Sequence, residues 1–328
     1  MPVSIQHQRT ILFAELLAVA FMGAVATAAH RTGVNLLLFP ELAALSHDVL
    51  TRPHGKWASQ PFRLILTPTL AAVAGSFITR HTHYNAIVLL VIVIASLFII
   101  RLLRSSIAPA ISAGVLPIVL DERRWIYPLV ICAGLIGLAL LMWVWQRCVS
   151  SMEAQPLASI LETIDDELET IPAERFWPIT LLTFVLVVAV ASQLTGLRFM
   201  LFPPLIVMAY EILGHPELPG WIERPALFPL VSFLTAFVGL VACRSFHGRP
   251  AGVVLTVAIS ILLLRCFRMH MPPALAIGVL PFVMTAPDAW YPISVAIGTT
   301  TLTFWFLARG YLRRSAINTN HNPDARNI

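Results

Sequence analysis

Two pairs of arginines are the residues best suited to bind a small charged solute. Within each pair the residues stand one helical turn apart: Arg101 and Arg104, then Arg265 and Arg268. The second pair repeats the first in the other half of the chain, and prolines follow both pairs, namely Pro109, Pro272 and Pro273. Proline is favoured in the first turn of a helix. We therefore expect short helices whose positive N-terminal ends, together with the guanidinium groups, bind an anion.

A purely structural role is the alternative for the same arginines. An arginine at the end of an apolar helix can extend its head group to the membrane interface and orient the helix in the bilayer. Duplication of the chain would preserve that role in both halves, just as it would preserve an anion site. The pattern alone does not choose between the two interpretations.

Prolines also open two other short apolar segments. The motifs are Phe39-Pro40-Glu41-Leu42 and Phe202-Pro203-Pro204-Leu205, which stand at matching places in the two halves. Helices broken at Pro40, Pro203 and Pro204 would place backbone N–H groups at mid-depth in a membrane, where an unhydrated anion needs donors. A simple helix kink is the alternative.

A few titratable side chains lie inside or beside apolar stretches. Glu15 interrupts the first stretch, and an acid there is costly enough to indicate a proton or ion pathway. The nearby Arg9 allows the alternative that Glu15 reaches the interface. His270 can titrate near neutral pH, so Glu15 and His270 are the candidates for proton coupling. Asp48 and Glu211 stand at matching places in the two halves and are expected to form salt bridges.

Signatures of metal binding, catalysis and nucleic-acid binding are missing from the sequence. No histidine pair has the spacing of metal ligands within a helix, and there is no H-E-x-x-H, G-x-S-x-G or phosphate-binding glycine loop. The basic residues are scattered among apolar stretches and are not clustered with aromatic residues. We therefore expect no metal, no cofactor, no enzymatic activity and no nucleic-acid partner.

Composition places these residues in a membrane protein. Apolar residues make up 58% of the 328 residues and charged residues 12%, compared with about 25% charged residues in an average soluble domain. A water-soluble fold could not bury that much apolar surface, so the lipid bilayer must be part of the solvent. The net charge of +5 suits anionic headgroups or an anionic solute. We expect a multi-pass protein of the plasma (inner) membrane.

Eight apolar stretches approach the ~20 residues that cross a ~30 Å hydrocarbon layer. They are 10–29, 62–79, 84–103 and 125–145 in the first half, and 176–194, 226–243, 250–267 and 288–308 in the second. Four further stretches are shorter or broken by proline, namely 34–46, 107–120, 197–213 and 271–284. Because irregular backbone survives at membrane depth only when it is buried in protein or lines a wet cavity, these four should face inward.

The second half of the chain repeats the first, and this repeat sets the expected domain organisation. Gly114 and Tyr127 recur in the second half, at the same spacing, as Gly278 and Tyr291. We predict an all-α, polytopic membrane helical bundle of two tandem repeats, each with four spans and two short broken or re-entrant helices. The predicted parts are a first repeat at 1–145, an acidic amphipathic linker at 146–175, a second repeat at 176–309 and a polar disordered tail at 310–328.

The repeat unit resembles the HPP family of integral membrane proteins. That family is named for a His-Pro-Pro motif that opens a short apolar segment before the last span of a four-span unit. Met271-Pro272-Pro273-Ala274 occupies that place in the second half, and Ala108-Pro109-Ala110 occupies it in the first. The family's Phe-Pro-Pro-Leu element matches Phe202-Pro203-Pro204-Leu205. The name-giving histidine is out of register, because Met271 stands there and His270 comes one residue early.

The resemblance covers nearly all of residues 10–309 and implies transport of a small anion, since plant members act as chloroplast nitrite transporters. Our first expectation is therefore a membrane transporter or channel-like protein for a small inorganic anion, with nitrite as the solute that the resemblance names. The alternative is a non-transporting membrane scaffold or assembly partner. A membrane-embedded enzyme that uses Glu15 or His270 as acid or base is a third hypothesis.

Overall fold

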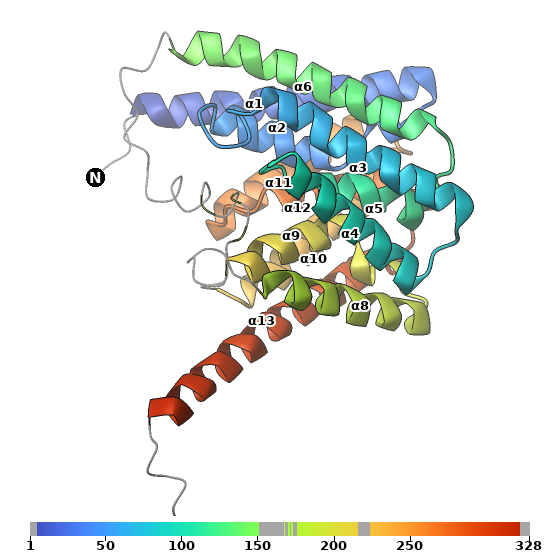
Figure 1. Ribbon diagram of the computed structural model, residues 1–328. Coiled ribbons are helices and arrows are strands. Elements are labelled where there is room, and N and C mark those ends of the chain that lie inside the picture. The colour runs from blue at the N-terminus through green and yellow to red at the C-terminus, as the bar shows by residue number, and fades with distance from the viewer. Residues whose placement is uncertain are drawn as a thin grey trace, which may run out of the picture.

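The computed structural model describes residues 5–150, 176–215 and 224–321, together with positions 167, 170 and 172. The regular elements within these residues are all helices, which confirms the expected all-α fold. Seven of the described helices are long and apolar enough to cross a membrane. They are α1 (Ile5–Thr32), α3 (Pro61–His81), α6 (Ile126–Ser150), α8 (Trp177–Thr195), α10 (Leu227–Ser245), α11 (Pro250–Phe267) and α13 (Tyr291–His321). Figure 1 shows them as one bundle, from which the end of α13 projects.

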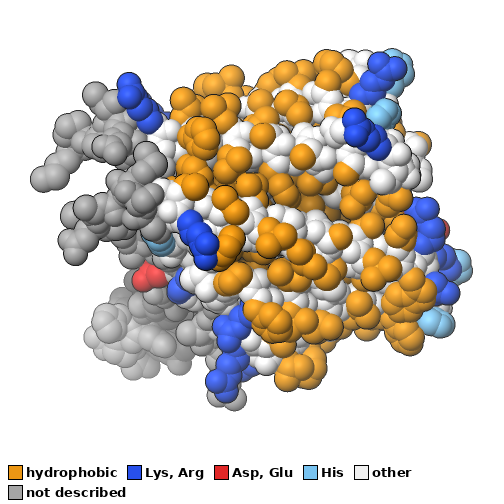
Figure 2. All heavy atoms as spheres, turned by 90° about the horizontal axis from the view of Figure 1, so that it is seen from above, with side chains coloured by type: hydrophobic (Ala, Val, Ile, Leu, Met, Phe, Trp, Pro, Cys, Tyr) orange, Lys and Arg blue, Asp and Glu red, His pale blue; other side chains and the backbone are white. Residues whose placement is uncertain are grey.

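The outside of the bundle is apolar. Phe62, Phe98, Leu129, Leu194 and Phe304 are exposed on helices that belong to both halves of the chain. Figure 2 shows side chains of this kind as a broad band between two rims that carry lysine and arginine. A bilayer requires an apolar band bounded by charged rims. The chain is therefore a multi-pass membrane protein in contact with lipid.

Two expected boundaries differ in the structure. The stretch 84–103 forms α4 (Ala86–Leu102), a helix of 17 residues that is shorter than the seven above and at the lower limit of lengths that cross a membrane. Helix α13 continues to His321, so residues 310–321 of the expected disordered tail are helical. No proline interrupts the chain between Pro292 and Pro323, which allows this extension. Most of the expected acidic linker, 146–175, lies outside the described residues, so its amphipathic helix stays a prediction.

The four short segments form broken helices inside the bundle. Their bounds are η1 (Asn35–Leu37) with α2 (Glu41–Thr51), α5 (Ala110–Leu120), η2 (Arg198–Leu201) with α9 (Pro203–Gly214), and α12 (Pro273–Val279) with η4 (Leu280–Phe282). Residues 41–50, 110–119, 203–214 and 273–282 are buried without exception. The expectation that these segments face inward is confirmed, and lipid contact is left to the longer helices.

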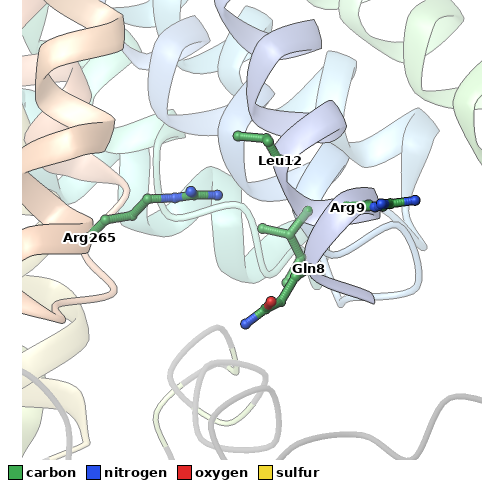
Figure 3. A pocket seen from close by; sticks show the side chains of 5 residues that line it. Gln8, Arg9, Leu12 and Arg265 are labelled. Carbon is green, nitrogen blue, oxygen red and sulfur yellow. The ribbon is translucent and has the colours of Figure 1, made fainter. Parts of the chain in front are cut away.

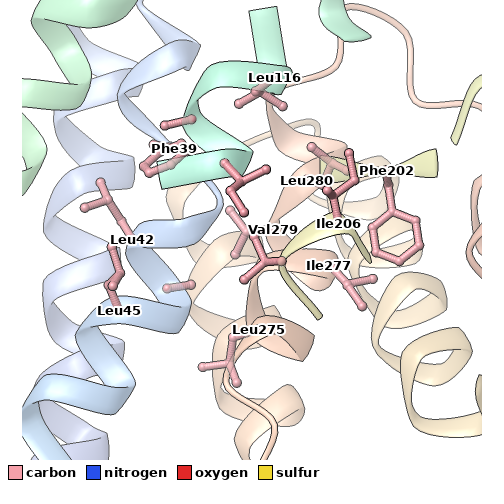
Figure 4. Packing of buried hydrophobic residues seen from close by; sticks show 14 of the residues in the cluster. Phe39, Leu42, Leu45, Leu116, Phe202, Ile206, Leu275, Ile277, Val279 and Leu280 are labelled. Atoms are coloured by element: carbon pink, nitrogen blue, oxygen red, sulfur yellow. The ribbon is translucent and has the colours of Figure 1, made fainter. Parts of the chain in front are cut away.

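Apolar side chains fill the region where the short helices meet. Helix α2 contacts α12, α5 contacts α9, and α9 contacts α12. Figure 4 shows the packing between them, formed by Phe39, Leu42, Leu45, Leu116, Phe202, Ile206, Leu275, Ile277, Val279 and Leu280. In this conformation the middle of the bundle is thus a packed hydrophobic core.

Each half holds its second short helix by the same two contacts. A Cβ atom added to Gly75 of α3 would lie 1.9 Å from the Gly114 carbonyl oxygen of α5, and one added to Gly239 of α10 would lie 2.0 Å from that of Gly278 in α12. Tyr127 donates a hydrogen bond from its hydroxyl to the Ala113 carbonyl at 2.9 Å, and Tyr291 donates to Ile277 at 2.6 Å. Close backbone contact through small residues is typical of membrane helices, and it explains why these glycines and tyrosines recur.

The two halves meet through matching elements. Helix α1 packs against α11, while α8, which occupies the corresponding position in the second half, packs against α4. Helix α2 packs against α12, while α9 packs against α5. The first helix of each half, α1 or α8, therefore contacts the helix just before the second short segment of the other half, α11 or α4. The molecule thus contains two interfaces of the same kind. We call them the α1–α11 interface and the α4–α8 interface.

Candidate functional site

An ion pair joins the two halves at the α1–α11 interface. Arg265 donates a hydrogen bond from Nε to Oε1 of Glu15 at 2.9 Å, and its Nη2 lies 2.5 Å from Oε2. Glu15 is only 8% exposed, whereas 45% of the Arg265 side chain is exposed. Two parallel contacts between a guanidinium and a carboxylate are the strongest ion-pair geometry available to side chains. A predicted proton-coupling residue and a predicted anion-binding residue therefore contact each other.

Two histidines extend this pair into a polar cluster. His47 of α2 places Nε2 3.9 Å from Glu15 Oε1, and its ring lies 6.3 Å from the ring of His270. His270, in the link between α11 and α12, places Nε2 3.8 Å from Asp48 Oδ1. Asp48 accepts a hydrogen bond from Nε of Arg52 at 3.1 Å. The salt bridge expected for Asp48 is confirmed. Arg265, Glu15, His47, His270, Asp48 and Arg52 form what we call the interface cluster.

Charges within the interface cluster balance when both histidines are neutral. Two carboxylates, Glu15 and Asp48, face two guanidinium groups, Arg265 and Arg52. Buried charges of this kind persist only when they are paired, because an isolated ion costs several kcal/mol to desolvate. One additional proton on a histidine would leave the cluster with a net positive charge, which would attract an anion. Chemically, the arrangement can link the binding of a proton to the binding of an anion.

A cavity of about 580 Å³ leads to the exposed side of Arg265. Gln8, Arg9, Ile11 and Leu12 of α1 form its other wall. Figure 3 shows Arg265 extending from α11 across toward α1, with Gln8 below it and Arg9 turned away on the far side of the helix. Water and small ions can thus reach one face of Arg265, while Glu15 holds the other face.

The other predicted arginines are exposed, and two of them end their helices with a left-handed backbone conformation. Arg104 has a φ of 48° and Arg268 a φ of 51°, both in the left-handed region. The backbone N–H of Arg104 donates to the Arg101 carbonyl at 3.1 Å, and Ser105 donates to Ile100 at 2.9 Å. Arg268 and its neighbours repeat this Schellman-type ending of the helix. Among the described residues, no ion pair joins Arg101, Arg104 or Arg268 to an acid.

The predicted prolines stand at the starts of the short helices. Pro40, Pro109 and Pro272 are the residues before the first helical turn of α2, α5 and α12, while Pro203, Pro204 and Pro273 stand in the first turn of their helices. No side chain caps any of these four helix starts. Their N-termini begin within the packed core of Figure 4, away from the cavity at Arg265.

The α4–α8 interface has a different character from its counterpart. A cavity of about 230 Å³ lies there, with Arg101 as its charged residue and apolar or aromatic side chains elsewhere. Pro178 stands at the position of Glu15, and Tyr210 stands at the position of His47. The α4–α8 interface thus has no counterpart of Glu15 or His47, although Arg101 and Glu211 stand where its counterpart has Arg265 and Asp48.

Comparison with family models, curated proteins and solved structures found no match to this chain. The likeness to the HPP family therefore rests on the short proline motifs alone. Within those motifs, His270 stands one residue before the position of the name-giving histidine, and here it faces Asp48. No three of the described His, Cys, Asp and Glu side chains are arranged to hold a metal ion.

Glu41 is a functional candidate that sequence reasoning did not select. The side chain is 0% exposed, and neither carboxyl oxygen has a hydrogen-bond partner among the described residues. The Ser112 hydroxyl of α5 is near enough to act on it as a hydrogen-bond donor, and Tyr127 of α6 interacts with it electrostatically, although the Tyr127 hydroxyl donates to Ala113. The N-terminus of α2 would favour a carboxylate by at most ~2 kcal/mol. An unpaired buried charge costs more than that, so burial favours the neutral form of Glu41.

Proposed function

We propose that this protein is a transporter of a small inorganic anion in the plasma (inner) membrane. One observation supports the proposal most strongly, namely the Glu15–Arg265 pair that joins the two halves beside an open cavity. A guanidinium group that faces water on one side can exchange a carboxylate partner for a soluble anion of the same charge. The resemblance of the proline motifs to the HPP family supports nitrite as the first solute to test.

Transport in this proposal proceeds by separation of the α1–α11 interface. An anion enters the cavity and contacts Arg265, while a proton on Glu15 or His47 releases the carboxylate from the guanidinium group. Loss of the pair then lets α1 and α11 move apart, so that the two halves separate at this interface. Arg104 and Arg268 attract anions toward the same membrane face but lie outside the ion pair.

Anion flux into reconstituted vesicles tests the proposal. Arg265→Gln should lower nitrite uptake on the order of tenfold or more, since a hydrogen bond to a charged group contributes about 1.5–3 kcal/mol. Arg101→Gln is the matched control, because Arg101 holds the corresponding position in the first half and has no acid partner among the described residues. Equal nitrite uptake by wild type and by Arg265→Gln, with both proteins folded, would contradict the proposal.

A non-transporting scaffold is the second candidate, and the packed core favours it. The short helices meet through apolar side chains in this conformation (Figure 4). Such a protein would co-purify with a stable partner and would leave vesicles impermeable to every anion in a panel that includes nitrite, nitrate and chloride. Uptake of any one of them that depends on Arg265 would exclude this candidate.

A further inference from the structure

Glu41 differs from the acids of the interface cluster in its surroundings. Glu15 is paired with Arg265 and Asp48 with Arg52. Glu41 lies on the same helix as Asp48, two turns earlier and on the same side, yet among the described residues it has no cation beside it. The elements packed around it contribute Ser112 and Tyr127 as interacting polar groups, and no charged side chain in the described parts of α1, α6 or α12 interacts with it.

The matching position in the second half shows that the fold does not need an acid there. Pro204 occupies the place of Glu41 in the otherwise similar Phe-Pro-x-Leu motif, and it is buried in the first turn of α9. Both α2 and α9 begin within the packed core. A carboxyl group at this point adds nothing to helix formation, because it accepts no hydrogen bond from the first turn. An ionisable residue inside a membrane that lacks a structural role indicates a proton or ion pathway.

We propose that Glu41 is a proton-binding site of this protein, occupied in the packed conformation and emptied when water reaches α2. In the packed conformation the group is the carboxylic acid. When the α1–α11 interface separates and water enters, the O–H bond breaks, the proton passes to water and a carboxylate remains. One proton would then move with each opening and closing. This last step rests on the proposed transport function, whereas the bound proton does not.

Infrared spectroscopy of the reconstituted protein tests the bound proton directly. The difference between wild type and Glu41→Gln at neutral pH should contain the carbonyl stretch of a protonated carboxyl group, and that band should shift in D2O. Absence of the band would overturn the proposal. Thermal unfolding gives a second measurement: Glu41→Gln, a neutral isostere of a neutral acid, should melt as wild type does, whereas Asp48→Asn should melt lower because it removes the charge that pairs with Arg52.

Flux measurements then test the coupling. With a pH-sensitive dye inside the vesicles, wild type should take up protons together with the anion, and Glu41→Gln should take up fewer protons per anion. An unchanged ratio of protons to anions in Glu41→Gln would remove Glu41 from the coupling. If wild type transports no anion at all, the proposed function fails, and the infrared band still decides whether Glu41 holds a proton.

Discussion

Arg104 and Arg268 occupy a backbone conformation that favours glycine. Each arginine has a positive φ at the residue that ends its helix, where a side chain costs about 1–2 kcal/mol relative to glycine. The same strained choice in both halves indicates that the side chains are needed for something other than ending the helix. Attraction of anions to the membrane face and anchoring at the lipid interface are the two roles that an exposed guanidinium can fill.

Replacement of both residues by glycine separates these roles. The double variant Arg104→Gly and Arg268→Gly should unfold at a higher temperature, because about 1 kcal/mol of strain is removed at each position. If the guanidinium groups attract the solute, nitrite uptake should fall even though the protein is more stable. Melting in detergent and flux in vesicles measure the two effects independently. A more stable variant with unchanged uptake would mean that these arginines only anchor the helices.

At the scale of the helices, two glycine contacts determine how the short segments are held. The backbones of α3 and α5 touch at Gly75 and Gly114, and those of α10 and α12 touch at Gly239 and Gly278. Neither contact leaves space for a single added carbon atom, and in each case the obstacle is a backbone carbonyl. Since a carbonyl of a helix cannot rotate away as a flexible side chain would, the helices themselves would have to separate.

Gly75→Ala and Gly239→Ala should each destabilise the protein, by about 1–3 kcal/mol or more, because overpacking of a tight contact costs that amount. The expected size is similar for both, since the added carbon meets the same atom at 1.9 and 2.0 Å. Gly137→Ala in α6 is the matched control: its added carbon meets only Phe21, at 3.9 Å, so helix propensity should make it neutral or slightly stabilising. Urea titration in detergent measures all three. Equal stability of Gly75→Ala and Gly137→Ala would contradict the close contact.

At the scale of the whole molecule, contacts between the links assign the ends of the helices to two membrane faces. Arg123 donates to the Thr82 carbonyl at 3.1 Å, which places the links before α4 and before α6 on one face. Gln146, near the end of α6, donates to the Pro53 carbonyl at 2.7 Å on the other face. Phe13 stacks on Trp145 with ring centroids 5.4 Å apart, so α1 begins on the face of Pro53. We call this face the N-terminal face.

Among the residues whose side chains the structure describes, those on the N-terminal face include more Lys and Arg. The N-terminal face holds Arg9, Arg52, Lys56, Arg63, Arg101, Arg104, Arg147, Arg224, Arg265, Arg268 and Arg309. The opposite face holds Arg31, Arg80, Arg123, Arg124, Arg198, Arg244 and Arg249. An excess of Lys and Arg in short loops marks the cytoplasmic side. We therefore predict that the N-terminal face, with the cavity at Arg265, is cytoplasmic.

Labelling of single cysteines in intact cells checks this orientation. In a background without the four native cysteines, a membrane-impermeant thiol reagent should react with Asp121→Cys, on the exposed link before α6, and should spare Lys56→Cys until the membrane is opened. The reverse pattern would place the cavity outside the cell. Reaction of both residues in intact cells would contradict the assignment of Asp121 and Lys56 to different faces.

The sequence predicts where the helices of this fold lie along the chain more reliably than which helices and side chains contact one another. The stretch 250–267 coincides with α11 because Pro250 begins the helix and the apolar run ends with it. The short segments are identifiable for the same local reason. The Glu15–Arg265 pair has no such signal, since its members stand in different halves of the chain and neither apolar pattern specifies which face meets which helix. Glu41 is not predicted because it stands in the motif Phe39-Pro40-Glu41-Leu42, where the proline is the residue used to predict a helix start.

The unequal character of the two interfaces has a consequence for motion. Surfaces held by ion pairs must take up water when they part, whereas surfaces lined by hydrocarbon can slide while they remain in contact. The α4–α8 side has Pro178 at the position of Glu15, so it lacks the counterpart of the Glu15–Arg265 pair and is suited to stay closed. In the proposed transport cycle the α1–α11 side is the edge that opens, so water would enter the molecule from one side only.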